Sequence, residues 1–183
     1  ARQLIEGRLK NGGRALDGTA GNGRDTLFLA QLVGGNGKVW AFDIQAQALS
    51  NTAGLLRENG VEERVELIAA SHADLADYVR EPLDAAMFNF GYLPGGDKTV
   101  TTKADSSVRA IQAAAALLAE SGLLTAVVYS GHPAGRAEAA AIEQWAAALP
   151  QEQYQVLHYH FTNQRNHPPQ LLAIEKRIQK PNR

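Results

Sequence analysis

The stretch Leu16-Asp-Gly-Thr-Ala-Gly-Asn-Gly-Arg-Asp-Thr26 determines how the whole chain is interpreted. It follows segment 14–17, which we expect to be a strand, and leads into the amphipathic segment 25–33, which we expect to be a helix. Gly21 and Gly23 allow the backbone to come close to a ligand at the turn between them. Ligands in open parallel sheets bind outside the carboxyl ends of the strands. The stretch therefore predicts a ligand-binding strand, loop and helix.

The rest of the chain continues the alternation of short apolar runs with amphipathic segments. We expect further strands at 38–43, 64–69, 84–89 and 123–129, helices at 45–59, 105–120 and 134–149, and a final pair of strands at 154–161 and 171–176. Strands that alternate with helices predict parallel βαβ units, and two consecutive strands predict an antiparallel edge. The predicted fold is one Rossmann-like α/β domain over residues 1–183, with a mostly parallel seven-stranded sheet, an antiparallel edge strand and helices on both faces.

Composition excludes several classes of protein. The 183 residues include no Cys, so a disulfide framework, a zinc-thiolate site and a thiol nucleophile are ruled out, and a reducing cytoplasm is the expected location. No apolar run reaches the roughly 20 residues of a membrane span. The net charge of −1 argues against a nucleic-acid binder with a wholly basic surface, so an RNA partner would need a local basic patch. The His-x-His pair His158 and His160 has no third ligand in view, and no metal site is expected.

Acidic residues around the glycine-rich stretch indicate which ligand it holds. Asp43 ends the second strand, where a carboxylate can accept hydrogen bonds from ribose hydroxyls. The spacing Gly-x-Gly-x-x-Gly is absent, which argues against a pyrophosphate site for NAD. Asp17 and Asp25 add negative charge that would repel a pyrophosphate but suit the sulfonium and ammonium groups of S-adenosylmethionine. The alternative is a glycine-rich connector with ordinary helix-capping acids.

A second candidate region follows the fourth strand, at Phe88-Asn-Phe-Gly-Tyr-Leu-Pro-Gly-Gly-Asp97. Its segment Asn89-Phe-Gly-Tyr92 resembles the Asn-Pro-Pro-Tyr loop of amino-methyltransferases, in which an Asn side chain and a backbone carbonyl orient the target amine. Such a site needs positioning more than strong acid–base chemistry. A β-turn loop hinged at Gly95 and Gly96 is the alternative interpretation.

Two histidines follow other strands at the same edge. Ser71-His72 comes after the third strand, where it would contact an adenine or, alternatively, cap the segment ahead of Asp74. His132 follows the fifth strand and would be either a general base near neutral pH or a cap on the next helix.

Together these motifs resemble the bacterial tRNA 5-aminomethyluridine methyltransferases. The resemblance runs from about Leu16 to Lys176, and its most specific part is Asn89-Phe-Gly-Tyr-Leu-Pro-Gly-Gly-Asp-Lys98. The other matching motifs are Asp17-Gly-Thr-Ala-Gly-Asn-Gly-Arg-Asp-Thr26, Ala41-Phe-Asp-Ile-Gln45, Thr101-Thr102, Gly131-His-Pro133 and Asn163-Gln-Arg-Asn166 with Pro168-Pro169. The family more often has Ala at the position of Gly18 and Leu at that of Phe90.

The resemblance implies a class I methyltransferase fold and transfer of a methyl group from S-adenosylmethionine to the primary amine of 5-aminomethyluridine at the tRNA wobble position. The expected catalytic residues are Asn89, Tyr92 and His132. The expected cofactor-binding residues are Asp17, Gly21, Asn22, Gly23, Asp25, Thr26, Asp43, Gln45, Ser71, His72 and Asn89. The expected substrate-binding residues are Tyr92, Pro94, Gly96, Asp97, Lys98 and Arg165.

Two other functions remain open at this stage. One is methylation of rRNA or of a small amine on the same scaffold, and the other is a catalytically silent module that binds S-adenosylmethionine or RNA. The anticodon region of tRNA is the expected partner, no membrane is expected, and a homodimer is left open. A basic face beside Asn89 would favour RNA, and its candidates are Lys98, Lys103, Arg136, Arg165 and the C-terminal segment 176–183.

Overall fold

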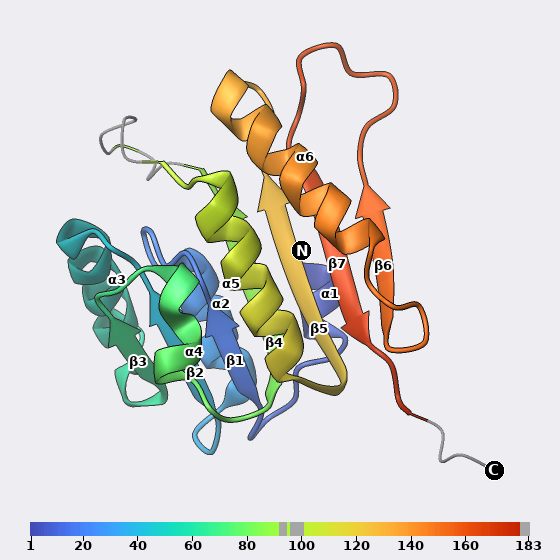
Figure 1. The fold of residues 1–183 in the computed structure, drawn as a ribbon. Helices are drawn as coiled ribbons and strands as arrows, with labels where there is room; N and C mark the ends of the chain where they lie inside the picture. Colours follow the sequence, from blue (N-terminus) through green and yellow to red (C-terminus); the bar gives the residue numbers. More distant parts are fainter. Residues whose placement is uncertain (92–94, 96–100, 180–183) are drawn as a thin grey trace.

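A computed structural model describes residues 1–91, 95 and 101–179 of the chain (Figure 1). The strands are β1 (Arg14–Asp17), β2 (Lys38–Phe42), β3 (Val65–Ile68), β4 (Leu83–Phe90), β5 (Leu118–Val128), β6 (Tyr154–Tyr159) and β7 (Gln170–Lys176). The helices are α1 (Arg2–Glu6), α2 (Arg24–Val33), α3 (Ala46–Glu58), α4 (Leu75–Tyr78), α5 (Ala104–Leu117) and α6 (Pro133–Ala147), with short 3₁₀ turns at Glu62–Arg64 and His72–Asp74.

The strands form one seven-stranded sheet in the order β3-β2-β1-β4-β5-β7-β6. The first five strands are parallel, and β7 runs antiparallel to both β5 and β6. The predicted fold class, with its antiparallel edge, is confirmed. Within that edge, β7 lies between β5 and β6, so β6 is the outermost strand.

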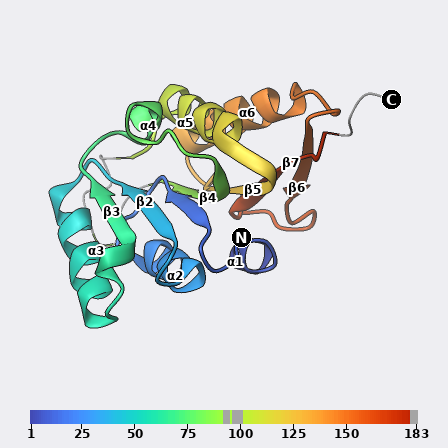
Figure 2. The ribbon, with the colours of Figure 1, turned by 90° about the horizontal axis from the view of Figure 1, so that it is seen from below.

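Helices cover both faces of the sheet, and each face has its own apolar core (Figure 2). On one face, α1, α2 and α3 bury Ile5, Leu29 and Leu56 against it. On the other face, α5 and α6 bury Ile111 and Ile142. This two-sided cover explains why β1, β2 and β4 are buried along nearly their whole length.

The sequence prediction of a helix over 105–120 is wrong at its carboxyl end. Helix α5 stops at Leu117, and Leu118 already pairs with Leu83 of β4. The register then shifts between Leu83 and Ala85, and Ser121 adopts a positive φ of 63°. Leu118 is buried in the same core as the apolar stripe of α5, so hydrophobic periodicity alone cannot separate the last helical turn from the first strand residue.

The sheet order positions the ligand site. The chain winds outward from β1 to β3 and then returns to β4 on the other side of β1. The connections that leave β1 and β4 therefore diverge at their carboxyl ends, and a crevice opens at this topological switch point.

Candidate functional site

A cleft of about 750 Å³ lies at the carboxyl ends of β1, β2 and β4. Five segments wall it: residues 18–22 with 24 and 25, residues 42–45, residues 70–72, residues 89–91 with 95, and residues 101–103 with 106 and 129. This volume lies in the range of about 300–1,000 Å³ that small-molecule sites occupy. Of the residues expected to bind the cofactor, those that line the cleft are Gly21, Asn22, Asp25, Asp43, Gln45, Ser71, His72 and Asn89.

The two glycines of the loop have different tasks. Gly21 has a φ of 55°, lines the cleft and donates its N–H to Oδ2 of Asp43 over 2.9 Å. Gly23 has a φ of 79° and is buried away from the cleft, where an added Cβ would lie 2.9 Å from the Cα of Thr52. Gly21 thus shapes the ligand surface, whereas Gly23 allows α2 to begin against α3.

Asp17 is buried inside the loop and does not line the cleft. Its Oδ1 accepts a hydrogen bond from the Thr19 N–H over 3.0 Å, and its Oδ2 accepts one from the Thr26 hydroxyl over 2.6 Å. Burial raises the pKa of Asp17 to about 7, an effect that these two hydrogen bonds oppose and that the neighbouring Asp25 and Asp43 reinforce. Asp17 and Thr26 therefore hold the loop in shape from behind the cleft.

The raised pKa of Asp17 predicts a pH-dependent stability. The folded state binds the proton more tightly than the unfolded chain does, so this group costs stability as pH rises from about 4 through 7. Asp17→Asn stays neutral, and its stability relative to the wild type should improve by roughly 2 kcal/mol between pH 5 and pH 8. Urea unfolding at the two pH values measures this difference. The matched control is Asp77→Asn on the exposed surface of α4. If the stability difference from the wild type were the same at pH 5 and pH 8 for both variants, the prediction would be contradicted.

Asp43 faces the cleft at the end of β2. Its Oδ1 accepts the Gln45 N–H over 2.9 Å, so each carboxylate oxygen is oriented by one backbone donor and keeps a further lone pair. The next residue, Ile44, lines the cleft with 65% of its surface exposed, although sequence reasoning did not select it. An apolar side chain this exposed beside a polar carboxylate is suited to the flat face of a base.

Ser71 and His72 line the cleft just after β3. The Ser71 hydroxyl accepts the Ala73 N–H over 3.2 Å, so it caps the short 3₁₀ turn as the alternative interpretation expected. The His72 ring contacts Phe88 and Phe90 edge-on, with centroid distances of 6.5 and 5.6 Å. Burial lowers the pKa of His72, and its Nε2 is buried with no hydrogen-bond partner in the part of the chain that the structure describes. A buried polar atom that lines a cleft without a partner indicates a ligand contact.

Asn89 stands exposed at the mouth of the cleft, and Thr19 holds its backbone. The Asn89 N–H donates to the Thr19 Oγ1 over 2.7 Å, which joins the glycine-rich loop to the segment that follows β4. Sequence reasoning missed Thr19, whose only local signal was a hydroxyl within a glycine-rich loop. The Thr101-Thr102 motif was not among the expected site residues, yet both residues line the cleft, and their hydroxyl oxygens are buried without partners among the described residues.

Several expected site residues are not among those that line the cleft. His132 is the N-cap of α6, and its Nδ1 accepts the Gly135 N–H over 3.0 Å, which is the capping alternative. Arg165 is exposed on the loop between β6 and β7. The residues Tyr92, Pro94, Gly96, Asp97 and Lys98 lie outside the described part of the chain.

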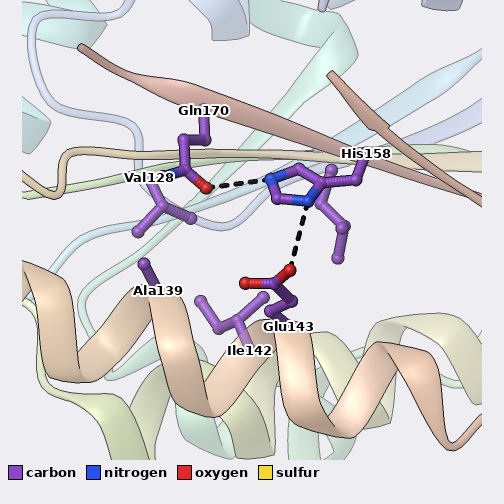
Figure 3. Close-up of a pocket in the computed structure, with 7 residues that line it drawn as sticks. Val128, Ala139, Ile142, Glu143, His158 and Gln170 are labelled. Atoms are coloured by element: carbon purple, nitrogen blue, oxygen red, sulfur yellow. Dashed lines mark hydrogen bonds and ion pairs between the residues drawn. The ribbon is translucent and has the colours of Figure 1, made fainter. Parts of the chain in front are cut away.

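A second, much smaller cavity of about 10 Å³ lies between α6 and the β6–β7 pair (Figure 3). His158 fills its edge, with Nε2 2.8 Å from Gln170 Oε1 and Nδ1 3.4 Å from Glu143 Oε1. The space is about one water in size, so this is a packing feature and not a ligand site. Among the described residues, no group of three His, Cys, Asp or Glu side chains is placed to hold a metal ion, and no helix is long and apolar enough to cross a membrane.

Solved structures with this fold identify the class of protein. A structure from Clostridium thermocellum, described as a "putative rRNA-methylase", matches with a TM-score of 0.94 and 39% identity, covering 96% of this chain and 94% of that one. A "putative methyltransferase" from Streptococcus mutans in complex with S-adenosylhomocysteine matches with a TM-score of 0.87 and 36% identity, over 96% and 94% of the two chains. The fold and the cleft define an S-adenosylmethionine-dependent methyltransferase.

The chain belongs to the family described as "Putative rRNA methylase", whose model matches residues 39–175. A curated relative from Arabidopsis thaliana, "tRNA (mnm(5)s(2)U34)-methyltransferase, chloroplastic", is 38% identical over an alignment of 152 residues that covers 78% of this chain. The chain spans 56% of the length of that relative.

Proposed function

We propose that this protein transfers a methyl group from S-adenosylmethionine to the primary amine of 5-aminomethyluridine at the tRNA wobble position, giving 5-methylaminomethyluridine. The observation that carries the proposal is the exposed Asn89, whose backbone is fixed to the glycine-rich loop at the mouth of the cofactor cleft. The Arabidopsis relative, whose name specifies this class of wobble nucleoside, supports the choice of substrate. Lys103, exposed and lining the same cleft, supports a polyanionic substrate.

The residues present fit the cofactor. Asp43, with both oxygens preoriented, would hold the ribose hydroxyls, and the Nε2 of His72 would meet a polar edge of the adenine beside Ile44. Asp25 lines the cleft, with one carboxylate oxygen paired with Arg2 over 2.7 Å, and its second oxygen would face a cationic ligand. When bound, S-adenosylmethionine supplies an electrophilic methyl group on a sulfonium.

The chain's own contribution to the reaction is alignment. The side-chain oxygen of Asn89 would accept a hydrogen bond from the amine and direct its lone pair toward the cofactor. A protonated ammonium has no lone pair, so the site must bind the neutral amine or release its proton to water. Holding the reactants in line removes much of the entropic barrier and requires no strong base.

Thr19 is expected to act through Asn89. Thr19→Val removes the acceptor of the Asn89 N–H, so kcat should fall about 10-fold, while Thr19→Ser should restore it. The affinity for S-adenosylmethionine should stay within about 5-fold in both variants, because the shifted loop loses at most one hydrogen bond, worth roughly 1 kcal/mol. Single-turnover kinetics and calorimetry measure the two quantities. Equal activity of the Val and Ser variants would remove the positioning role.

Mass spectrometry of tRNA nucleosides tests the function itself. Cells that lack the protein should accumulate 5-aminomethyluridine, and the purified protein with S-adenosylmethionine should convert it to the methylated form. If rRNA or a free amine were methylated while this tRNA was not, one of the alternatives on the same scaffold would replace the proposal. Cofactor binding without transfer to any of these would indicate a silent module.

A further inference from the structure

The segment from Gln153 to Ile174 contains no Asp or Glu, although the chain has 19 acidic residues in total. It covers β6, the loop after it and β7 as far as Ile174, the residue before Glu175, and it carries Arg165, three histidines and several Asn and Gln side chains. A stretch without negative charge, rich in hydrogen-bonding groups, is compatible with a polyanion, which carboxylates at this surface would repel.

Three aromatic rings are exposed at this end of the sheet. Tyr129 is 43% exposed, Tyr159 60% and Phe161 51%, and the last two rings lie edge-to-face with centroids 6.2 Å apart. We call these three residues the aromatic patch. Large aromatic side chains are usually buried, so three exposed rings in one region suggest a partner that stacks on them.

The sheet register fixes the face of the sheet on which Tyr159 lies. Val127 pairs with Leu171, and Leu171 pairs with Tyr159, so these side chains lie in one row across β5, β7 and β6. Phe161 follows β6 and packs its ring against that of Tyr159, and Tyr129 directly follows β5. The opposite face is covered by α6, where His158 meets Glu143 (Figure 3). On the face of Tyr159, the nearby acid is Glu175 of β7, which lies opposite Gln155 and is paired with Arg8 over 2.7 Å.

The aromatic patch is continuous with the cofactor cleft. Tyr129 lines the cleft, and a Cβ built on Gly91 would lie 3.6 Å from its Cδ2. The loop after β6 contacts the segment after Tyr129, since a Cβ built on Gly131 would lie 3.9 Å from the His167 carbonyl oxygen. Gln170 anchors the base of this loop, because its Nε2 donates to Ser130 Oγ over 3.5 Å. The loop rises at the edge of the sheet where β5 ends (Figure 1).

We propose that the aromatic patch, together with Arg165, binds unpaired nucleotides of the RNA beside the one whose amine enters the cleft. Every base has a face that stacks on an aromatic ring, and Arg165 offers a cation to the backbone. The inference rests on the proposed function, because it places RNA at the mouth of the same cleft. It adds a requirement for single-stranded RNA, since the bases of a duplex are already stacked on one another.

The test compares variants of the full chain on three probes: an RNA hairpin with an unpaired loop, an RNA duplex of the same length, and S-adenosylmethionine alone. The wild type should bind the hairpin better than the duplex. Tyr159→Ala with Phe161→Ala should weaken hairpin binding at least 10-fold, on the scale of one or two lost stacking contacts. Tyr159→Phe with Phe161→Tyr should preserve it, and cofactor affinity should be unchanged in both. Val156→Ala, on the other face of β6, is the matched control.

Three results would overturn the proposal. In the first, the wild type binds the duplex and the hairpin equally well. In the second, the double alanine variant binds the hairpin as tightly as the wild type does. In the third, the wild type is a dimer, the double alanine variant is a monomer, and hairpin binding persists. The last would assign the aromatic patch to a second copy of the chain, and sedimentation velocity detects it. A different result would contradict the proposed function and leave this inference standing: the wild type binds a hairpin that carries 5-aminomethyluridine but does not methylate it.

Discussion

Replacing Asn89 with alanine should slow methyl transfer by about 100-fold, the scale expected when one positioned polar group is lost. The affinity for S-adenosylmethionine should change little, because the backbone N–H of residue 89 keeps its bond to Thr19. The side chain is exposed, so the substitution opens no cavity in the core. Single-turnover kinetics on tRNA that carries 5-aminomethyluridine, with calorimetry for the cofactor, separates the two effects.

Companion variants and a pH series make this result specific. Asn89→Asp keeps an acceptor oxygen and should retain more activity than the alanine variant. The wild-type rate should rise with pH until the bound amine is mostly neutral. His132→Ala removes the N-cap of α6 and should cost about 1 kcal/mol of stability, without altering that pH profile. Near-normal turnover of Asn89→Ala would exclude the amine-orienting role.

Replacing Asp43 with alanine should weaken S-adenosylmethionine binding by roughly 1.5–3 kcal/mol, the range for a charged hydrogen-bonding group. This corresponds to about 10-fold to 150-fold in Kd. Two causes act together. The ribose loses its acceptor, and the N–H groups of Gly21 and Gln45 lose the carboxylate that orients the loop.

Asp43→Asn separates these causes, because it can still accept one of the two backbone N–H groups. Its loss of affinity should be smaller than that of the alanine variant. Isothermal titration calorimetry gives both values, and Asp77→Ala on the exposed surface of α4 serves as the control. If Asp43→Ala bound the cofactor as tightly as the wild type, the ribose would have to be held elsewhere.

Local sequence patterns predicted most of the fold. Each parallel strand is an apolar run followed by a turn signal, and the acids Asp17 and Asp43 lie at strand ends as expected. The helix 105–120 was placed too long, because Leu118 is buried whether it ends a helix or begins a strand. Helices as short as α1 and α4 carry too little periodicity to be detected.

The candidate site was predictable only where its signal was local. Gly21, Asp43 and Asn89 stand out by residue type and position, and all three line the cleft. The bond between Thr19 and Asn89 joins residues 70 positions apart, and it exists only because β1 and β4 are neighbours in the sheet. For His132, residue type suggested a base, whereas its position directly before Pro133 produces a cap.

The buried carboxylate of Asp17 links the occupancy of the cleft to proton exchange with the solvent. Its pKa of about 7 means that small changes in nearby charge alter its average protonation at physiological pH. A cation in the cleft favours the ionised form of Asp17, so its binding releases part of the Asp17 proton to solvent. A neutral ligand does not change the protonation of Asp17 in this way. By thermodynamic reciprocity, rising pH must favour the cationic cofactor over its neutral demethylated product. We therefore expect the preference of the cleft for cofactor over product to increase with pH.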